Sequence, residues 1–243
     1  NIMNQAIGAK IADYLIKPVN PNQILLALKK NIHRREIVSE VAESSYRSEF
    51  SRIGMQLSEN MDFEGWKELY KKLVFWELEL AETGGAMAEM IQMQKEEANL
   101  NFAKFIRRNY EGWFSAPEGR PLMSMDLMKA TVFPRLSAGK NLFLIVLDNL
   151  RFDQWRTLAR ELKNDFDIDE DLYLSILPTA TQYARNAIFA GMTPLDIRRT
   201  YPDLWIEEEE EESKNQNEEA LIQSLLERYR RRETFTYTRV NGA

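Results

Sequence analysis

Apolar residues recur at helical spacing through a long stretch of the chain, residues 23–116, that contains no proline. One set steps by four, three and four residues, and the next steps alternately by three and four. Each set lies along one face of a helix, which is typical of helices packed on a shared core. A third set follows at helical intervals, so the stretch predicts a small antiparallel three-helix bundle. The sets are Tyr46, Phe50, Ile53 and Leu57; Trp66, Leu69, Leu73, Trp76 and Leu80; and Met87, Ile91, Phe102 and Phe105.

The ends of these helices carry recognisable signals. Asp62 is placed to cap the second helix, the pair Gly84-Gly85 to end it, and Gly112 to close the third. The large apolar side chains of the stripes are expected in the core, because a bundle must bury them before it can offer a groove to a partner. A dimer face on the bundle stays open as an alternative.

The pattern changes after Pro117. Residues 142–147 form an unbroken apolar run, Asp148 follows it, and a helical period begins at Gln154. This order is typical of a buried parallel strand that leads into a helix. Further strands are expected over 172–177 and 234–238 and a helix over 182–190, so the second half is predicted to be α/β.

A short α/β signature also precedes the bundle. Residues 11–16 have the composition of a strand, and Asn20-Pro21 is typical of a helix cap followed by proline at the first helical position. The helix is expected to continue through Leu28. These residues predict one βα unit without the rest of its sheet.

Composition and charge narrow the class of protein. The 243 residues are 44% apolar and 29% charged, which excludes a disordered chain. The net charge of −6 is concentrated in residues 203–219, where nine acidic residues face one lysine, and the six glutamates at 207–212 favour a solvated loop over a cation site. The chain has no cysteine and no apolar run long enough to cross a bilayer, so a cytoplasmic protein without disulfides or thiolate metal sites is expected. No compact basic recognition helix is visible, and no direct DNA binding is expected.

Lys17 is followed by Pro18 at the end of the first predicted strand, where the ring fixes the turn and the ammonium is held in place to neutralise an anion. With Asp13 and Tyr14 before it and the Pro21 helix after it, this segment resembles the last strand and helix of a two-component receiver domain. The resemblance implies that Lys17 contacts a phosphoryl group and that Tyr14 rotates on activation. It also implies a phospho-acceptor aspartate and a Mg²⁺ site on earlier strands, which would precede this chain. The alternative is a surface lysine before a turn proline.

The second group of polar residues lies in the predicted α/β part. Asp148 directly follows an apolar strand, at the edge where open α/β sheets bind ligands. About thirty residues on, Pro178-Thr179-Ala180-Thr181 leads into the predicted helix. A hydroxyl at Thr181 would meet the unpaired N–H groups and the positive end of the helix dipole, which suit a phosphate oxygen. A nearby divalent ion would lower the pKa of that hydroxyl.

These residues, with Gly191 ten positions after the second threonine, resemble the alkaline phosphatase superfamily, and the run 148–156 looks like its PglZ-type branch. The resemblance implies that Asp148 is a metal ligand and that Thr181 is both nucleophile and ligand, with Thr179 structural; the two threonines exchanging roles is the alternative. Many phosphodiesterases of the superfamily have asparagine three positions after the nucleophile, where this chain has Ala184. Arg185 and Asn186 are the candidates to replace it as the phosphate contact. The alternative without catalysis is that Asp148 and Thr181 each cap a helix.

The resemblance implies a zinc site with several histidine ligands. His33 is the chain's one histidine and belongs to the helical half, where a surface position at a helix end is expected. The zinc site is therefore expected to be incomplete in this chain, with the other ligands supplied by later sequence. Because the chain begins at Asn1 instead of methionine, we expect a fragment that lacks both ends, and its own activity is uncertain.

The order of the parts resembles the PorX-type response regulators of the type IX secretion system. The expected fold is α/β plus all-α: the tail of a CheY-like receiver over 1–34, a helical bundle over 35–116, and the start of a PglZ domain over 117–243. The resemblance implies a cytoplasmic homodimer that a sensor histidine kinase phosphorylates and that acts through a sigma factor. Two functions remain open: a zinc-dependent phosphodiesterase or phosphatase in the full-length protein, or a signalling scaffold that acts by dimerisation and does not need catalysis.

Overall fold

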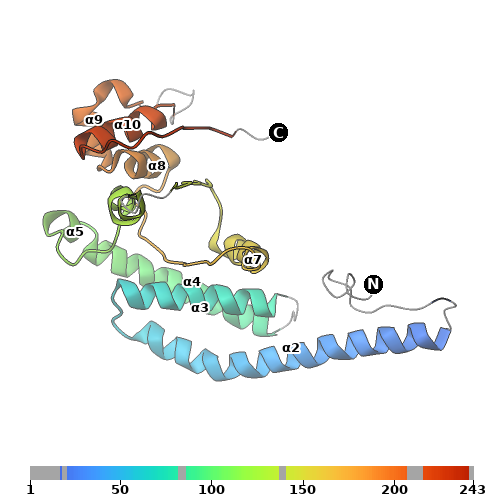
Figure 1. Ribbon diagram of the computed structural model, residues 1–243. Helices are drawn as coiled ribbons and strands as arrows, with labels where there is room; N and C mark the ends of the chain where they lie inside the picture. Colours follow the sequence, from blue (N-terminus) through green and yellow to red (C-terminus); the bar gives the residue numbers. More distant parts are fainter. Residues whose placement is uncertain (1–16, 18–20, 82–85, 137–140, 207–215, 241–243) are drawn as a thin grey trace. The chain divides into compact units, whose positions relative to one another are not determined.

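The computed structural model describes residues 17, 21–81, 86–136, 141–206 and 216–240, and it leaves aside the side chains of residues 26 and 29–39. The chain divides into two compact units, Asn1–Tyr110 and Glu111–Ala243 (Figure 1). In the described part, no helix combines the length and the apolar character that crossing a membrane requires.

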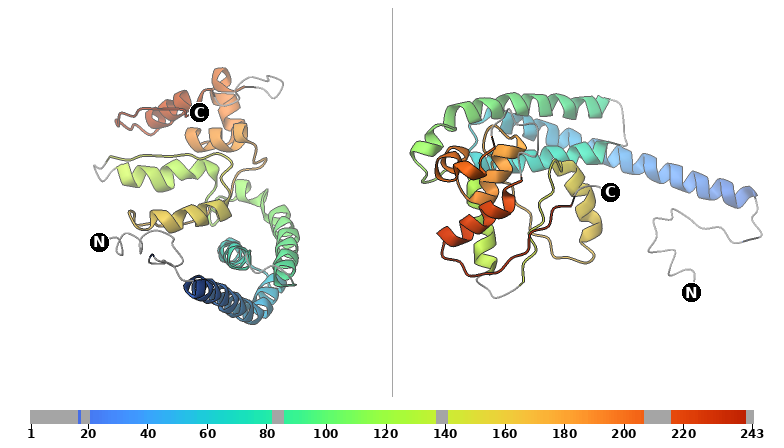
Figure 2. Two further views of the ribbon diagram at one scale, coloured as in Figure 1. Left: turned by 90° about the vertical axis from the view of Figure 1, so that its right-hand side faces the viewer. Right: turned by 90° about the horizontal axis from the view of Figure 1, so that it is seen from above.

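The N-terminal unit contains three long helices, α2 (Pro21–Ser58), α3 (Phe63–Leu80) and α4 (Ala86–Asn109), which pack against one another (Figure 2). Asp62 is the N-cap of α3, and its Oδ1 accepts a hydrogen bond of 2.8 Å from the Gly65 N–H, as predicted. The all-α bundle predicted from the three stripes is confirmed.

The three predicted stripes meet in one core. Tyr46, Ile53 and Leu69 are fully buried there, and the aromatic residues pack closely: the ring centroids of Trp66 and Phe102 are 5.3 Å apart. Every member of the predicted stripes is either buried in this cluster or packed against it. The spacing of apolar residues therefore identified the core of the unit.

One buried polar link ties α2 to α4 inside this core. The Tyr46 hydroxyl donates to Gln94 Oε1 at 2.9 Å, and Gln94 Nε2 donates to the Phe50 carbonyl at 2.9 Å. Tyr46 is 0% exposed and Gln94 is 4% exposed. Because polar groups without partners are costly in a core, the pair favours one register of α4 against α2.

Burial of its hydroxyl raises the pKa of Tyr46 to about 12. An unfolded tyrosine titrates near 10, so the unfolded state loses this proton first. The folded state therefore keeps its full stability below about pH 10 and loses about 2–3 kcal/mol of unfolding free energy as the pH rises towards about 12.

We expect Tyr46→Phe to remove this part of the pH dependence of the unfolding free energy. Urea unfolding at pH 8 and pH 11.5 measures it, with Tyr70→Phe on the exposed face of α3 as the control. Equal pH dependence in both variants would contradict the prediction.

The receiver-like segment is described only in part. Lys17 is exposed, while Tyr14 and the strand predicted over 11–16 lie outside the described residues. The helix predicted to start at Pro21 is present, but it does not end near Leu28; it runs without a break into the first bundle helix. One helix thus crosses the predicted border between residues 34 and 35.

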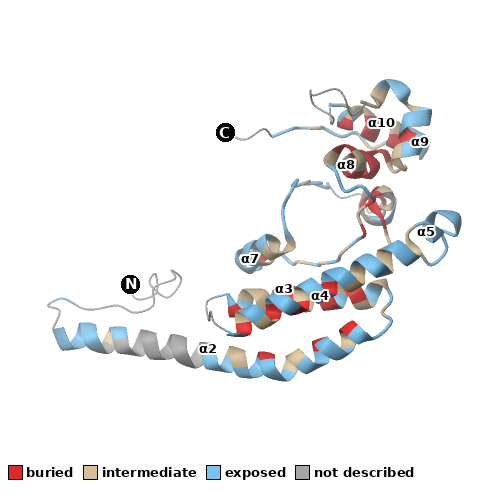
Figure 3. Cartoon of the chain, turned by 180° about the vertical axis from the view of Figure 1, so that it is seen from behind, coloured by how far each residue is buried: buried red, intermediate tan, exposed pale blue. Residues whose placement is uncertain are grey.

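The C-terminal unit is built from short helices. Its core is formed by α8 and α10 together with α9 and the residues around Phe133 (Figure 1). Seven of the ten residues of α8 are buried, which appears as a nearly continuous red segment in Figure 3. The elements are α5 (Gly112–Ser115), η1 (Ser124–Asp126), η2 (Met128–Val132), α6 (Phe133–Leu136), α7 (Phe152–Leu162), α8 (Thr181–Ala190), α9 (Pro194–Thr200), η3 (Pro202–Leu204) and α10 (Glu218–Arg228).

The strands predicted for this unit are not formed in the described residues. The run 142–147 is non-helical and unpaired there, and Phe143 and Ile145 are 88% and 77% exposed instead of buried. Residues 234–238 also form no ladder. Over 172–177 the pairing is a single parallel bridge between Leu174 and Met123. The prediction of α/β strands is therefore wrong for this structure, because a strand needs a partner at its edge and the described residues provide one only at Leu174.

Candidate active site

Thr181 is the first residue of α8, the helix at the centre of the C-terminal unit. The N-cap is Ala180, which makes no side-chain capping bond. At the other end Gly191 adopts a left-handed conformation with φ of 58°, and a Cβ at this position would lie 2.8 Å from Leu225 Cδ1. Arg228 donates to the Ala190 carbonyl there, a favourable place for a cation. The glycine ten positions after Thr181 therefore ends the helix.

Asp148 lies in a turn 33 residues before Thr181, and the structure brings the two side chains together. The Thr181 hydroxyl donates to Asp148 Oδ2 at 3.3 Å. The following residue, Asn149, has a φ of 59°, a left-handed conformation that asparagine tolerates better than most residues. The structure thus places Asp148 beside the second threonine of the motif.

The alternative in which both residues only cap helices does not hold. The N-cap of α7 is Arg151, and its backbone N–H donates to Gln154 Oε1 at 3.0 Å. Thr181 lies inside α8 and not at its cap position. Both side chains are thus left to contact each other.

Arg185 lies one turn after Thr181 on the same face of α8 and joins this pair to a buried acid. Its Nη1 is 3.2 Å from Asp148 Oδ2, and its Nη2 is 2.8 Å from Glu218 Oε2 and 2.7 Å from Glu218 Oε1. The Asp148 side chain is 48% exposed, that of Arg185 19% and that of Glu218 0%. The ion pairs therefore run from the surface at Asp148 to the interior at Glu218.

Glu218 was not recognised from the sequence, which placed it at the end of an acidic, solvated segment. It is fully buried at the start of α10, and it accepts a hydrogen bond of 2.5 Å from the Tyr237 hydroxyl. Burial and the Glu218 carboxylate both raise the pKa of Tyr237. A signal was available, because Glu218 precedes Leu221, Ile222 and Leu225 at helical spacing and so belongs to the apolar face of α10.

The remaining candidate residues have clear positions. Asn186 is 4% exposed, in the buried face of α8, and Ala184 is also buried. Thr179 is exposed in the segment before α8.

In the PglZ-like run 148–156, Trp155 and Arg156 both contact Glu170. Trp155 makes a hydrogen bond of 2.8 Å and Arg156 an ion pair of 2.9 Å, so both side chains link α7 to the segment that follows it.

The oxygens of Asp148 and Thr181 fit two ligands of one metal ion. Two ligands of a tetrahedral zinc, each about 2.0–2.1 Å from it, stand about 3.3 Å apart, which matches the 3.3 Å between Oδ2 and Oγ1. Among the described residues, however, no group of three histidine, aspartate or glutamate side chains could hold an ion. His33 lies in α2, and its side chain is not among those described. The described residues alone therefore do not make up a metal site, and Asp148 Oδ2 is also 3.2 Å from the Arg185 guanidinium.

Two family profiles match the chain. The profile of the PorX response regulator linker domain matches residues 36–114, which span most of the bundle. That of the BREX system PglZ alkaline phosphatase-like domain matches residues 127–242 and includes Asp148, Thr181 and Glu218. The chain therefore combines a linker domain of the PorX response regulators with a PglZ domain. The PorX linker and the PglZ domain follow each other in the predicted order, and the PglZ match makes the C-terminal unit alkaline phosphatase-like. No curated protein matches the chain.

Proposed function

We propose that the PglZ domain of this PorX-type regulator carries a metal-dependent phosphodiesterase or phosphatase centre with Thr181 as its nucleophile. The observation that supports this most is the hydrogen bond from the Thr181 hydroxyl to Asp148, with Arg185 one helical turn away. A nucleophile held by a carboxylate next to a cation is the arrangement that phosphoryl transfer requires.

In the proposed reaction, Thr181 Oγ1 forms a bond to phosphorus and gives up its proton to solvent, while the bond from phosphorus to the leaving oxygen breaks and that oxygen takes a proton from solvent, which leaves Thr181 esterified to the phosphoryl group of a monoester or to the remaining ester of a diester. Water then attacks this phosphorus and releases Thr181. The carboxylate of Asp148 orients the hydroxyl through the hydrogen bond at 3.3 Å. The unbonded backbone N–H groups in the first turn of α8 are candidate donors to the phosphate oxygens.

Arg185 is the proposed phosphate contact. Its guanidinium is 19% exposed, so it reaches the surface at Asp148 while Glu218 holds it from below. A planar, permanently charged group suits phosphate oxygens and offsets the charge that develops during transfer. The buried Asn186 is less well placed for this role.

Asp148 and Thr181 are the described residues that would hold a zinc ion, together with ligands from outside the described set. When bound, zinc supplies a lower pKa for the Thr181 hydroxyl and a countercharge for the phosphate.

At the level of the cell, the proposal is a cytoplasmic homodimer that controls type IX secretion. A sensor histidine kinase would phosphorylate its Mg²⁺-dependent receiver part, where Lys17 and Tyr14 would act in the switch, and a sigma factor would be the output partner. The PorX linker match supports the response-regulator part of this proposal.

The test uses the full-length protein in which these residues occur. We expect it to hydrolyse an aryl phosphodiester such as bis(4-nitrophenyl) phosphate, or the corresponding monoester. Removal of the metal with a chelator should abolish hydrolysis, and zinc should restore it where magnesium alone does not. The liberated nitrophenol measures the rate. Hydrolysis that survives complete metal removal would contradict the metal-dependent site, and no hydrolysis of either ester would favour the scaffold function.

A further inference from the structure

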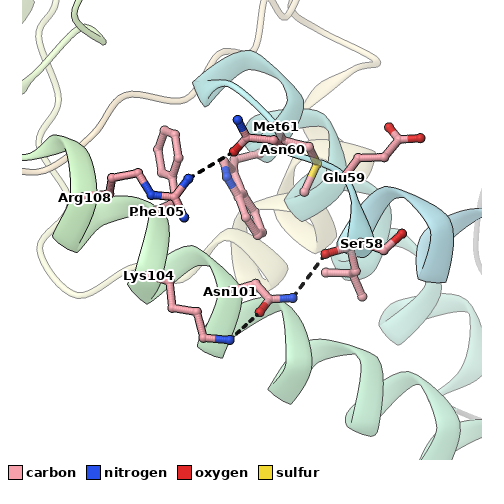
Figure 4. Close-up of a pocket in the computed structure, with 10 residues that line it drawn as sticks. Ser58, Glu59, Asn60, Met61, Asn101, Lys104, Phe105 and Arg108 are labelled. Atoms are coloured by element: carbon pink, nitrogen blue, oxygen red, sulfur yellow. Dashed lines mark hydrogen bonds between the residues drawn. The ribbon is translucent and has the colours of Figure 1, made fainter.

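The bundle carries a pocket of about 340 Å³ that has no part in the proposed phosphoryl transfer. It lies where the C-terminal end of α2, the loop after it, the start of α3 and the last turns of α4 meet (Figure 4). This volume is in the range of sites for small molecules. All of its lining residues belong to the N-terminal unit.

Two cations line this pocket without a carboxylate partner among the described residues. Lys104 Nζ contacts Asn101 Oδ1 at 3.1 Å, and Arg108 Nη1 contacts Asn60 Oδ1 at 3.3 Å. Both partners are neutral amides. In Figure 4 the carboxylate of Glu59, the acidic residue of the lining, points away from both cations.

Both cations are exposed, so water can solvate them, but their spacing also suits a bound anion. Lys104 and Arg108 are four residues apart on α4, where like charges repel. The negative end of the helix dipole explains basic residues in the last turn, Arg107 and Arg108, but the effect fades within one turn and does not reach Lys104. An anion between the two side chains would remove their repulsion.

Trp66 provides an independent observation. It lines the same pocket, its side chain is more than nine-tenths buried, and its Nε1 has no hydrogen-bond partner. A buried N–H without an acceptor is costly, and most native structures avoid it. This Nε1 is covered by its neighbours, so a ligand oxygen would satisfy the donor after a shift of the covering atoms.

We propose that this pocket binds the phosphate group of a small ligand. A phosphate monoester or phosphonate carries close to two negative charges and three acceptor oxygens, which match two cations and an additional N–H donor. A carboxylate has one charge and two oxygens and would leave part of this set unused. The test distinguishes free phosphate from an organic phosphate ester as the source of this group.

The test follows the Trp66 indole N–H signal by ¹H–¹⁵N NMR in the intact chain, because this signal reports on the bundle pocket and not on Thr181. The signal is assigned with Trp66→Phe. The probes are inorganic phosphate, phenylphosphonate, which cannot be hydrolysed, and phenylacetate. We expect phenylphosphonate to shift the signal saturably, and Lys104→Gln and Arg108→Gln each to weaken its binding about tenfold.

Arg107→Gln is the matched control, because Arg107 neighbours Arg108 in the same turn but does not line the pocket. It removes the same charge and should leave the affinity within about twofold. Saturation by inorganic phosphate as tightly as by phenylphosphonate would support a site for free phosphate, and weaker inorganic binding a site for an ester. An unmoved Trp66 signal, an equal response to phenylacetate, or an equal loss in Arg107→Gln would overturn the proposal.

Discussion

Replacing Thr181 by valine is expected to lower kcat/KM for phosphodiester hydrolysis by the full-length protein by about 10³-fold or more, because the nucleophilic oxygen is lost. Valine keeps the shape and β-branching of threonine, so the helix is little affected. The lost hydroxyl donates one hydrogen bond, to the half-exposed carboxylate of Asp148, which water can replace. We therefore expect the unfolding free energy to change by less than about 1 kcal/mol. Release of nitrophenol and urea unfolding measure the two quantities.

Thr179→Val is the matched control, since this threonine lies two residues earlier, is exposed and has the same chemistry. It should retain nearly full turnover. If Thr179→Val abolished turnover and Thr181→Val did not, the two threonines would have exchanged roles. Retained turnover in both variants would remove Thr181 as the nucleophile.

The same variant separates catalysis from scaffolding. A Thr181→Val protein that dimerises and still supports type IX secretion would show that signalling does not need the reaction. Loss of secretion with normal dimerisation would instead make the site at Thr181 part of the signal.

The bundle could be predicted because its information is local. The step from Trp66 to Leu69 and Leu73 places the three side chains on one helical face whatever the rest of the chain does, and Asp62 caps α3 from within its own turn. The buried Tyr46–Gln94 link could not be predicted. It joins residues 48 apart in the sequence, and neither residue type by itself indicates burial.

The strands predicted for the C-terminal unit depend on contacts between distant residues, which the local sequence does not give. The apolar run 142–147 predicts side chains that avoid water, but whether it becomes a buried strand depends on a neighbour elsewhere in the chain, and Phe143 and Ile145 are exposed in the structure. Leu174 pairs with Met123, and Ile176 N–H donates to Ser124 Oγ at 3.0 Å, so Leu174 and Ile176 are buried without a ladder. Composition does not specify such contacts.

The candidate site also has a part that could be predicted from the sequence and a part that could not. The spacing of Asp148 and Thr181 follows a motif, so it could be read from the sequence before their contact was known. The position of Arg185 follows from that of Thr181, because residues four apart share a helical face. Glu218 depends on a contact between α8 and α10, which the charge pattern concealed by grouping it with the glutamates at 207–212.

Replacing Glu218 by alanine is expected to destabilise the C-terminal unit by about 3 kcal/mol, the lower end of the range for a broken buried ion pair. The variant removes an acid that is 0% exposed and leaves Arg185 and the Tyr237 hydroxyl without their shared acceptor. The cost is not larger, because the Arg185 side chain is 19% exposed and keeps its contact with Asp148. Urea unfolding of the intact chain measures this effect.

Glu219→Ala is the matched control for Glu218→Ala, since it removes an exposed carboxylate from the same first turn of α10 and should cost less than about 1 kcal/mol. Glu218→Gln keeps the shape and an acceptor oxygen but not the charge, so an intermediate loss would show that charge and hydrogen bonding both contribute. If Glu218→Ala and Glu219→Ala were equally stable, the buried pair would not hold α8 to α10. Because Glu218 is the acid that holds Arg185 from the interior, a large loss in Glu218→Ala alone would mean that the side chain proposed to contact phosphate is positioned by the core of the unit.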